Sequence, residues 1–182
     1  MSDTRDQLKI IAVERIQKDN LAASSFREMG KAAGIKSSSV HYHFKSRDAL
    51  LLELVKDFRS GFFDALQRRT GDISSPRQRL QHLFMMYADY YQGHELTLAL
   101  AYQASYQELT EECRQAIAEF HDELQQWVLD SLQPARFLPI SKESLALVVS
   151  SSLQGALMMD RGQESAVHLD AVQEWLASLS SL

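Results

Sequence analysis

Polar side chains able to contact phosphates and base edges are concentrated in one short stretch, residues 36–47 (KSSSVHYHFKSR). It contains three consecutive serines, two histidines, a tyrosine and three Lys or Arg residues. Hydroxyl, imidazole and cationic groups are donors that proteins use on the DNA backbone and in its grooves. Val40 and Phe44 are four residues apart, so a helix that buries both leaves the polar groups facing outward. This stretch therefore favours binding to nucleic acid.

The residues before this stretch predict the elements that would position it. Ser25 and Glu28 form an S-x-x-E capping box, which predicts that a helix begins there. Gly34 fits the end of that helix, because glycine adopts the left-handed conformation at no steric cost. Two short helices joined by such a turn form a helix-turn-helix, whose second helix enters the major groove of DNA. The first helix is expected to bury the side chains at helical spacing, which are Phe26, Met29, Ala32 and Ala33.

The stretch GKAAGIKSSSVHYHFKSRDALL resembles the DNA-binding signature of the TetR/AcrR family of bacterial transcriptional regulators. The resemblance covers roughly residues 8–58 and includes the A-G-I turn, Phe44 and the basic residue before "ALL". Two positions depart from the family pattern. His41 stands where the family usually has tyrosine, and the loop at residues 18–21 lacks the common glycine-aromatic pair. Neither departure removes a polar residue that would face the groove.

The resemblance implies that each subunit places residues 36–43 in a major groove. The residues expected nearest to the base edges are Lys36, Ser37, Ser38 and Ser39. The residues expected to contact phosphates or the groove wall are His41, Tyr42, His43, Lys45 and Arg47. From the first motif helix, Ser25 and Arg27 are expected to hold the DNA backbone.

The charge distribution supports this placement. The whole chain has a net charge of −5, but residues 1–50 carry nine Lys or Arg against six Asp or Glu, a net of +3. Residues 51–182 carry ten against eighteen, a net of −8. Between Asn20 and Arg47, five basic residues are opposed only by Glu28. The basic footprint therefore coincides with the motif. The alternative is that these charges form a solvated face.

The rest of the chain is predicted to be helical. Apolar residues at helical spacing predict helices at residues 4–18, 46–69, 76–93, 95–107 and 141–161, one that begins after Thr110, and a last one that carries Leu169 and Leu179. No alternating strand pattern and no internal repeat is present. The predicted fold is all-α, with a three-helix DNA-binding domain at residues 1–47 and a helical regulatory and dimerisation domain at residues 48–182. The resemblance implies that the long helix after Ser46 joins these two parts.

Composition narrows the class of protein further. No run of about 18 uncharged apolar residues occurs, and the N-terminus lacks an apolar signal region, so a cytoplasmic protein without membrane contact is expected. The single cysteine excludes an intrachain disulfide framework and a CxxC zinc site. Cys113 lies on an apolar stripe and is expected to be a buried structural residue, with a redox sensor as the alternative.

The sequence offers no catalytic constellation. A di-iron bundle needs Glu-x-x-His on two helices, and that motif is absent, as are H-E-x-x-H, GxGxxG, a P-loop and G-x-S-x-G. His121 has Asp122 and Glu123 beside it, and a solvated polar face is expected there in preference to a metal site. We therefore expect no enzyme activity, no metal and no cofactor.

Aromatic and methionine side chains are frequent in the middle of the chain. In the family that the chain resembles, helices of this region enclose a pocket for a small, often hydrophobic effector. Such side chains with a few polar tips are typical of the lining of small-molecule pockets. Part of them must be ordinary core. The candidates for the pocket are Tyr87, Tyr91, Tyr102, Phe120 and Trp127.

The last two predicted helices fit a dimer interface. The helix at residues 141–161 is apolar around much of its girth, and Ser150, Gly155 and Ala156 would allow close approach of a partner helix. Two copies of this helix pair suit a four-helix bundle, which is where the family dimerises. The alternative is that both helices pack within one core.

Taken together, these observations predict a sequence-specific DNA-binding transcriptional regulator, in the form of a repressor that binds a palindromic operator as a homodimer. A small, hydrophobic effector is expected to release it. The alternative is a helical module of the same shape that binds a ligand or a protein without DNA.

Overall fold

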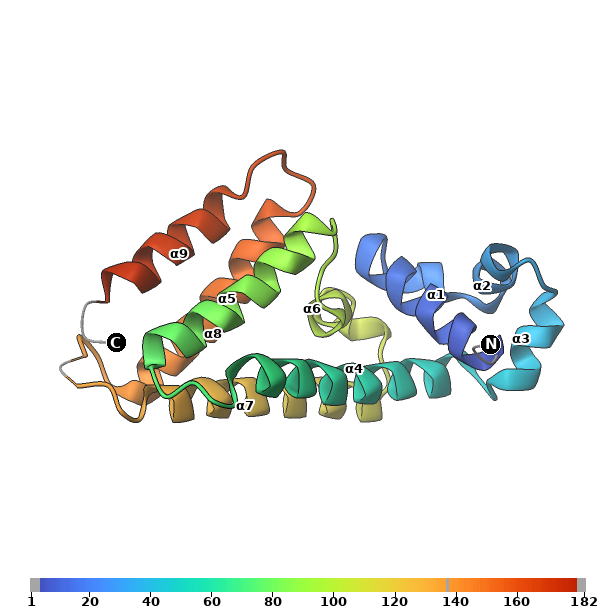
Figure 1. The fold of residues 1–182 in the computed structure, drawn as a ribbon. Coiled ribbons are helices and arrows are strands. Elements are labelled where there is room, and N and C mark those ends of the chain that lie inside the picture. The colour runs from blue at the N-terminus through green and yellow to red at the C-terminus, as the bar shows by residue number, and fades with distance from the viewer. Residues whose placement is uncertain (1–3, 137, 180–182) are drawn as a thin grey trace. The chain divides into compact units, whose positions relative to one another are not determined.

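The computed structural model describes residues 4–136 and 138–179, and within them every regular element is a helix (Figure 1). The predicted all-α fold is therefore confirmed. In chain order the elements are α1 (Thr4–Lys18), the 3₁₀ turn η1 (Leu21–Ser24), α2 (Phe26–Ala33), α3 (Ser37–His43), α4 (Arg47–Thr70), α5 (Pro76–Gln92), α6 (Leu98–Gln103), the 3₁₀ turn η2 (Tyr106–Glu108), α7 (Glu111–Leu132), α8 (Lys142–Asp160) and α9 (Val167–Ser178).

Many of these helices begin at a serine or threonine whose hydroxyl caps the first turn. The Oγ of Ser25 accepts a hydrogen bond from the backbone N–H of Glu28 at 3.3 Å. The Oγ of Ser46 accepts one from Ala49 N–H at 3.0 Å. Such caps satisfy backbone donors that have no partner inside the helix. The same arrangement begins α5, α6, α7 and α8.

One predicted helix is shorter than expected. The sequence predicts a helix over residues 95–107, whereas α6 ends at Gln103 and η2 follows it. The guanidinium of Arg114 donates to the carbonyl oxygens of Tyr106 and Gln107, at 3.2 and 3.4 Å. It also lies 4.8 Å from the centre of the Tyr106 ring. These side-chain contacts, made from the next helix, satisfy carbonyl groups that a longer helix would otherwise bond.

The chain divides into two compact units. The first unit contains the described residues up to Ser60 together with residues 97–118, and the second contains residues 61–96 with the described residues after 118. Helices α4 and α7 contribute to both units. The boundary at residues 47 and 48 proposed from the sequence separates the motif from the rest of α4, and it stays a functional prediction.

The core of the first unit surrounds the helix-turn-helix. Helix α1 packs against η1, α2 and α6, and α2 packs against α3. The buried side chains include Leu8, Ala12, Ile16, Met29, Val40 and Phe44. This core covers the apolar faces of the two motif helices, as the spacing of apolar residues predicts.

The buried face of α2 differs from the prediction at two positions. Ala32 is exposed and Ala33 is only half-buried, whereas Gly30 is buried. A Cβ atom on Gly30 would lie 2.9 Å from the carbonyl oxygen of Ile35 and 3.2 Å from the backbone nitrogen of Ser37. Helix α2 thus meets the following turn backbone to backbone, and no residue larger than glycine fits at this point.

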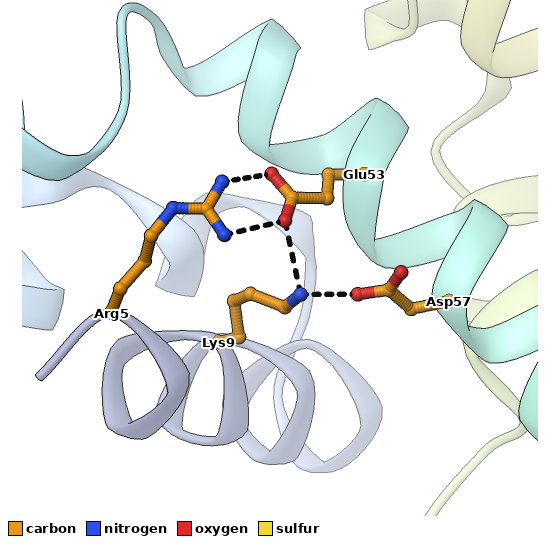
Figure 2. Close-up of polar contacts among 4 residues, drawn as sticks. All are labelled: Arg5, Lys9, Glu53 and Asp57. Carbon is orange, nitrogen blue, oxygen red and sulfur yellow. Dashed lines mark hydrogen bonds and ion pairs between the residues drawn. The ribbon is translucent and has the colours of Figure 1, made fainter. Parts of the chain in front are cut away.

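An ionic cluster ties α1 to the first half of α4 (Figure 2). The two terminal nitrogens of Arg5 donate to the two carboxylate oxygens of Glu53, at 2.8 and 2.5 Å. The Nζ of Lys9 bonds Glu53 at 3.0 Å and also pairs with Asp57. Two-pronged pairing of arginine with a carboxylate fixes orientation as well as distance. The cluster therefore sets the angle at which α1, and the motif helices packed on it, meet α4.

The second unit is a bundle in which α5, α8 and α9 lie against one another (Figure 1). Arg79 on α5 donates to Ser131 Oγ at 2.8 Å and stacks 4.7 Å from the ring centre of Trp127. The buried carboxylate of Asp160 accepts hydrogen bonds from the backbone N–H groups of His168 and Leu169, at 3.1 and 2.8 Å. It thereby caps the start of α9 and fixes that helix on α8.

The close approach at Gly30 predicts a specific loss of stability. We expect Gly30→Ala to lower the free energy of unfolding by about 1–3 kcal/mol, the usual cost of overpacking. The control is Gly61→Ala, because Gly61 lies inside α4 with open space where a Cβ would stand. That change should stabilise the protein by about 0.5–1 kcal/mol through helix propensity. Urea denaturation of the full chain measures both, and equal stability of Gly30→Ala and the parent would contradict the close approach.

The ionic cluster predicts a pH dependence of stability. The hydrogen bond from Arg5, aided by Lys9, lowers the pKa of Glu53 below its ordinary value of 4.5. Because the folded pKa is lowered, the stabilisation is complete above pH 4.5 and is lost as the pH falls through the folded pKa. The Arg5 and Glu53 side chains are 37% and 30% exposed, so solvent screens the pair and its contribution should stay below about 1 kcal/mol.

Denaturation of Glu53→Gln between pH 7 and 3 tests this expectation. The variant should be less stable than the parent at neutral pH, and the difference should shrink as the solution is acidified. Glu14→Gln, a change at an exposed carboxylate of α1, is the control. A stability difference for Glu53→Gln that does not change with pH would contradict the assignment.

Candidate nucleic-acid interface

Helix α3 presents the polar stretch to solvent. Val40 and Phe44 are buried, and Tyr42 is 88% exposed. The predicted contact residues divide into two groups by exposure. Those that are exposed are Lys36, Ser38, Ser39, His41, Tyr42 and Lys45, and those that are half-buried are Ser37 and His43. The surface predicted for base and phosphate contacts thus lies on one helix and the residues that flank it.

The turn before α3 is held by backbone hydrogen bonds. Gly34 has φ of +67°, in the left-handed region that the sequence predicts for it. The N–H of Ile35 donates to Gly30 O at 2.9 Å, and the N–H of Gly34 donates to Lys31 O at 3.4 Å. On the other side of α3, the N–H of Phe44 donates to Val40 O at 3.1 Å. The first two bonds close the end of α2 and form the turn into α3, and the last one closes the final turn of α3 itself.

His41 is partly engaged with the core. Its ring packs edge-on against the ring of Phe26, with centres 4.6 Å apart. His41 as a whole is nonetheless exposed. This contact holds the aromatic side of α3 against α2, and it gives His41 a positioning role beside the predicted one.

The two predicted contacts from α2 lie at its start. Ser25 is half-buried and uses its Oγ as the helix cap, whereas Arg27 is exposed. Backbone N–H groups at the start of a helix and a nearby cation both favour an anion. This arrangement agrees with a phosphate contact at the start of α2, which stays a prediction.

In the structure, the side chain of Arg47 makes hydrogen bonds within the protein. Its guanidinium donates to the carbonyl oxygen of Leu21 at 2.6 Å, and its Nε lies 3.3 Å from Ser24 Oγ. These bonds close η1 onto the first turn of α4. This role is not predictable from the sequence, because residues 18–21 have the pattern of a loop and no local signal marks a contact 26 residues away. Asn20, which caps η1 by accepting from Ala23 N–H at 3.3 Å, was the local signal for the turn.

The predicted pocket residues do not all lie in one unit. Tyr87, Tyr91, Phe120 and Trp127 belong to the second unit, and Tyr102 belongs to the first. Tyr102 is buried, and its hydroxyl donates to Leu51 O at 2.9 Å, which ties α6 to α4. That contact gives Tyr102 a structural role that sequence spacing does not reveal.

The four candidates in the second unit occupy different environments. Tyr87 and Phe120 are fully buried, and the ring of Phe62 lies 6.5 Å from the first and 5.2 Å from the second. The hydroxyl of Tyr91 donates to Gln163 O at 3.2 Å. Trp127 is half-buried and lines a groove of about 390 Å³ with Phe63 and others. Only a part of the predicted set is thus grouped around one aromatic core.

Burial favours the neutral form of three tyrosines, the cysteine and one histidine on α5, α6 and α7. Burial raises the pKa of Tyr90 to about 12, and it also raises the pKa of Tyr87 and of Tyr102. Burial likewise raises the pKa of the Cys113 thiol, which agrees with the expected structural cysteine. Burial lowers the pKa of His121, whose ring packs 5.5 Å from that of Phe120. His121 is half-buried and Asp122 beside it is exposed, so the expected solvated face holds at Asp122 and only in part at His121.

The part of the chain that the structure describes holds neither a metal cluster nor a membrane span. No group of three or more His, Cys, Asp or Glu side chains is arranged to hold a metal ion there. Within the same residues, every helix is too short or too polar to cross a bilayer.

Two segments of the chain match known protein families. Residues 12–54 match the family described as "Bacterial regulatory proteins, tetR family". Residues 76–175 match the family described as "Transcriptional regulator LmrA/YxaF-like, C-terminal domain". The first match covers the helix-turn-helix, and the second covers more than half of the chain.

The curated relatives that the chain matches include HTH-type transcriptional repressors. The HTH-type transcriptional repressor KstR2 of Mycolicibacterium smegmatis is 33% identical over 81 residues, which cover 44% of this chain and 40% of that protein. KstR2 of Mycobacterium tuberculosis is 27% identical over 130 residues, which cover 70% of this chain and 64% of that protein. The matches thus span less than two thirds of the length of these relatives.

Solved structures share the fold over nearly the whole chain. A TetR transcriptional regulator from Legionella pneumophila has a TM-score of 0.89 at 23% identity, with 97% of each chain covered. KstR2 of Mycobacterium tuberculosis, described as a ketosteroid transcriptional regulator, has a TM-score of 0.73 at 21% identity, with 98% of this chain and 94% of that chain covered. At these identities the likeness concerns the fold alone. Together with the two family matches, it shows that this chain belongs to the TetR family of bacterial transcriptional regulators.

Proposed function

We propose that this protein is a transcriptional repressor that binds a palindromic operator in the cytoplasm as a homodimer and is released by a small, hydrophobic effector. The observation that carries the proposal is the outward face of α3, where hydroxyl, imidazole, phenol and ammonium groups stand on and beside a helix with only Val40 buried within it. A surface helix with this composition, anchored by the turn at Gly34, suits the major groove.

The contacts divide by the chemistry of the side chains. Lys36, Ser38 and Ser39 lie at the start of α3, the end of a recognition helix that reaches the base edges. Tyr42 and Lys45 lie towards its other end and are assigned to phosphates or the groove wall. Arg47 keeps its intramolecular bonds to η1, and it acts by positioning the start of α4. Phosphate contacts fix register, and contacts to bases select sequence.

Homodimerisation is supported by apolar side chains left uncovered on the last two helices. On α8, Leu147, Val148 and Met159 are exposed, and so is Gly155, which has open space where a Cβ would stand. On α9, Val167 is exposed. Apolar residues on adjacent helices suit pairing with a second copy, since a symmetric dimer uses the same patch twice.

The residues for the dimer test differ from those that the sequence suggests. Ala156 is only 5% exposed within one chain, and Ser150 is buried as well, so both serve the packing inside the protomer. A charge at Ala156 would therefore disturb the fold itself. Substitution of a side chain that is exposed in the single chain tests the dimer interface without disturbing the fold of the protomer.

An effector for this protein is supported by the descriptions of two structural neighbours. One structural neighbour, from Saccharomonospora viridis, is described as a complex with choline, and has a TM-score of 0.79 at 17% identity. KstR2 is described as a ketosteroid transcriptional regulator. For this chain, the aromatic core around Phe62 and Phe120 favours a ligand with apolar surface.

A phosphate contact by Lys45 predicts a change in the salt dependence of DNA binding. Lys45→Ala should weaken binding to all sequences, and the slope of log K against log salt should fall by about one unit for each phosphate contact that the change removes. The control is Lys56→Ala, which removes an exposed lysine of α4. Fluorescence anisotropy on one duplex at several salt concentrations measures both slopes. An unchanged slope for Lys45→Ala would remove Lys45 from the interface.

Base contacts by the serines predict the opposite pattern. Ser38→Ala and Ser39→Ala should change which bases are preferred, because each removes a hydroxyl that can bond a base edge. A good base contact is worth roughly 1–3 kcal/mol of discrimination. Selection from random duplexes compares the consensus of each variant with that of the parent. The same consensus for both variants and the parent would show that these hydroxyls do not select sequence.

The proposed dimer predicts that one charge on α8 separates the subunits. Val148 is 40% exposed, and Val148→Glu should yield monomers that hold the operator weakly, because two carboxylates would meet across the symmetric contact. Met85→Glu on α5 is the matched control, since Met85 is 45% exposed in the same unit. Sedimentation velocity at micromolar concentration decides the matter. A monomeric parent, or a Val148→Glu variant that stays dimeric, would contradict the interface.

A further inference from the structure

The phenol hydroxyl of Tyr87 lies in the core of the second unit with no hydrogen-bond partner among the described residues. The side chain projects from α5 and is fully buried. A donor that leaves water on folding and finds no acceptor destabilises the folded state. Phenylalanine at this position would give the same packing without that penalty.

The phenylalanine cluster that Tyr87 joins through Phe62 cannot accept a hydrogen bond from its hydroxyl. Phe62 stands edge-on to Tyr87, with ring centres 6.5 Å apart. The rings of Phe62 and Phe63 both pack against Phe120, with centres 5.2 and 5.6 Å apart. A buried water molecule needs two or more polar partners, and these phenylalanine side chains offer none. The nearby Tyr90 phenol, whose charge would act on that of Tyr87, makes no hydrogen bond with the Tyr87 hydroxyl. Burial also raises the pKa of Tyr87, so its hydroxyl keeps its proton and is available as a donor.

Tyr102 shows how the same chain satisfies a buried tyrosine. Tyr102 in the first unit is as deeply buried as Tyr87, and its hydroxyl donates to Leu51 O at 2.9 Å. The hydroxyl of Tyr91 likewise finds Gln163 O at 3.2 Å. The unsatisfied hydroxyl of Tyr87 therefore stands out against two tyrosines whose hydroxyls have acceptors.

We infer that the Tyr87 hydroxyl donates a hydrogen bond to an uncharged acceptor oxygen, a ketone or ester carbonyl, on a lipophilic molecule that binds in the second unit. The inference rests on the proposed effector role and specifies the chemistry of the ligand. A carboxylate would lose its hydration among Phe62, Phe63 and Phe120 without gaining a counter-ion from them. A hydrocarbon skeleton gains contact with the same rings as they move apart to admit it.

The first test needs no ligand. Tyr87→Phe should raise the midpoint of thermal unfolding by about 2–4 °C, because it removes an unsatisfied buried hydroxyl. Tyr102→Phe is the matched control and should lower the midpoint, since it leaves Leu51 O without that donor. A lower midpoint for Tyr87→Phe would show that its hydroxyl has a partner in the free protein, a water molecule included, and would overturn the inference.

The second test uses probes that share the tetralin skeleton: 1-tetralone with a carbonyl, tetralin without it, and 1,2,3,4-tetrahydro-1-naphthoate with a charge. Isothermal titration calorimetry should show that the parent prefers the ketone to both others. Tyr87→Phe should weaken ketone binding by about 2- to 10-fold, the factor for one neutral hydrogen bond, and leave tetralin binding unchanged. Failure of the ketone to bind at millimolar concentration, or an equal loss for ketone and hydrocarbon, would overturn the inference.

Neither readout involves DNA, so the two proposals can fail separately. Operator binding is measured on the same parent sample by anisotropy. Absence of DNA binding with a selective ketone site would reject the repressor and keep the Tyr87 assignment. DNA binding without any ketone preference would keep the regulator and reject the assignment.

Discussion

The orientation of α3 depends on a backbone contact that only glycine permits. A helix of seven residues cannot sustain itself in water, because so few hydrogen bonds do not offset the cost of starting the helix. Within its length α3 buries only Val40, and Phe44 follows at its end. The remaining restraints are the approach of α2 to the turn at Gly30, the left-handed conformation of Gly34 and the packing of the His41 ring on Phe26. These contacts hold a polar surface helix in place and leave its serines and Tyr42 free of any positioning role.

The elements beside the motif helices are joined to α4 by polar contacts at several points, which use arginine, lysine and a tyrosine hydroxyl. Arg5 grips Glu53, Arg47 closes η1 onto the first turn of α4, and Tyr102 bonds Leu51 O. Such bonds are directional, so they fix angles in a way that apolar burial alone does not. In the proposed repressor, the angle between the motif and α4 determines where α3 lies relative to the operator, and these bonds define it within the first unit.

The parts of the structure that sequence could predict are those set by neighbours along the chain. Ser25 with Glu28, and Gly34 at the helix end, carry their meaning within a few residues, and the structure confirms the cap and the positive φ. The long helix after Ser46 was predictable for the same reason. The contacts of Arg47 and Tyr102 join residues 26 and 51 positions apart, and no local pattern records them.

The burial of a side chain was predictable only where the helical spacing of apolar residues is enough to determine it. Ala32 matches the helical spacing of a buried residue yet is exposed, because Gly30 makes the close contact with the following turn. Ala156 has the small side chain of an interface residue but packs inside its own chain. The spacing of apolar residues predicts one apolar face of a helix. The packing of the other helices determines which residues of that face are buried. The candidate pocket residues share a side-chain type, which does not predict which of them lie together. In the structure, Tyr102 belongs to the first unit and the other four belong to the second.

The central claim is that this protein reads a symmetric DNA site through α3. The most direct measurement is selection of genomic fragments by the full-length protein, followed by hydroxyl-radical footprinting of the bound fragments. The account predicts an enriched fragment with two symmetric protected stretches, about 10 base pairs or a multiple of that apart, both abolished when residues 37–39 are replaced by alanine. Absence of any fragment enriched over non-specific DNA, or a footprint that survives the alanine replacements, would contradict it.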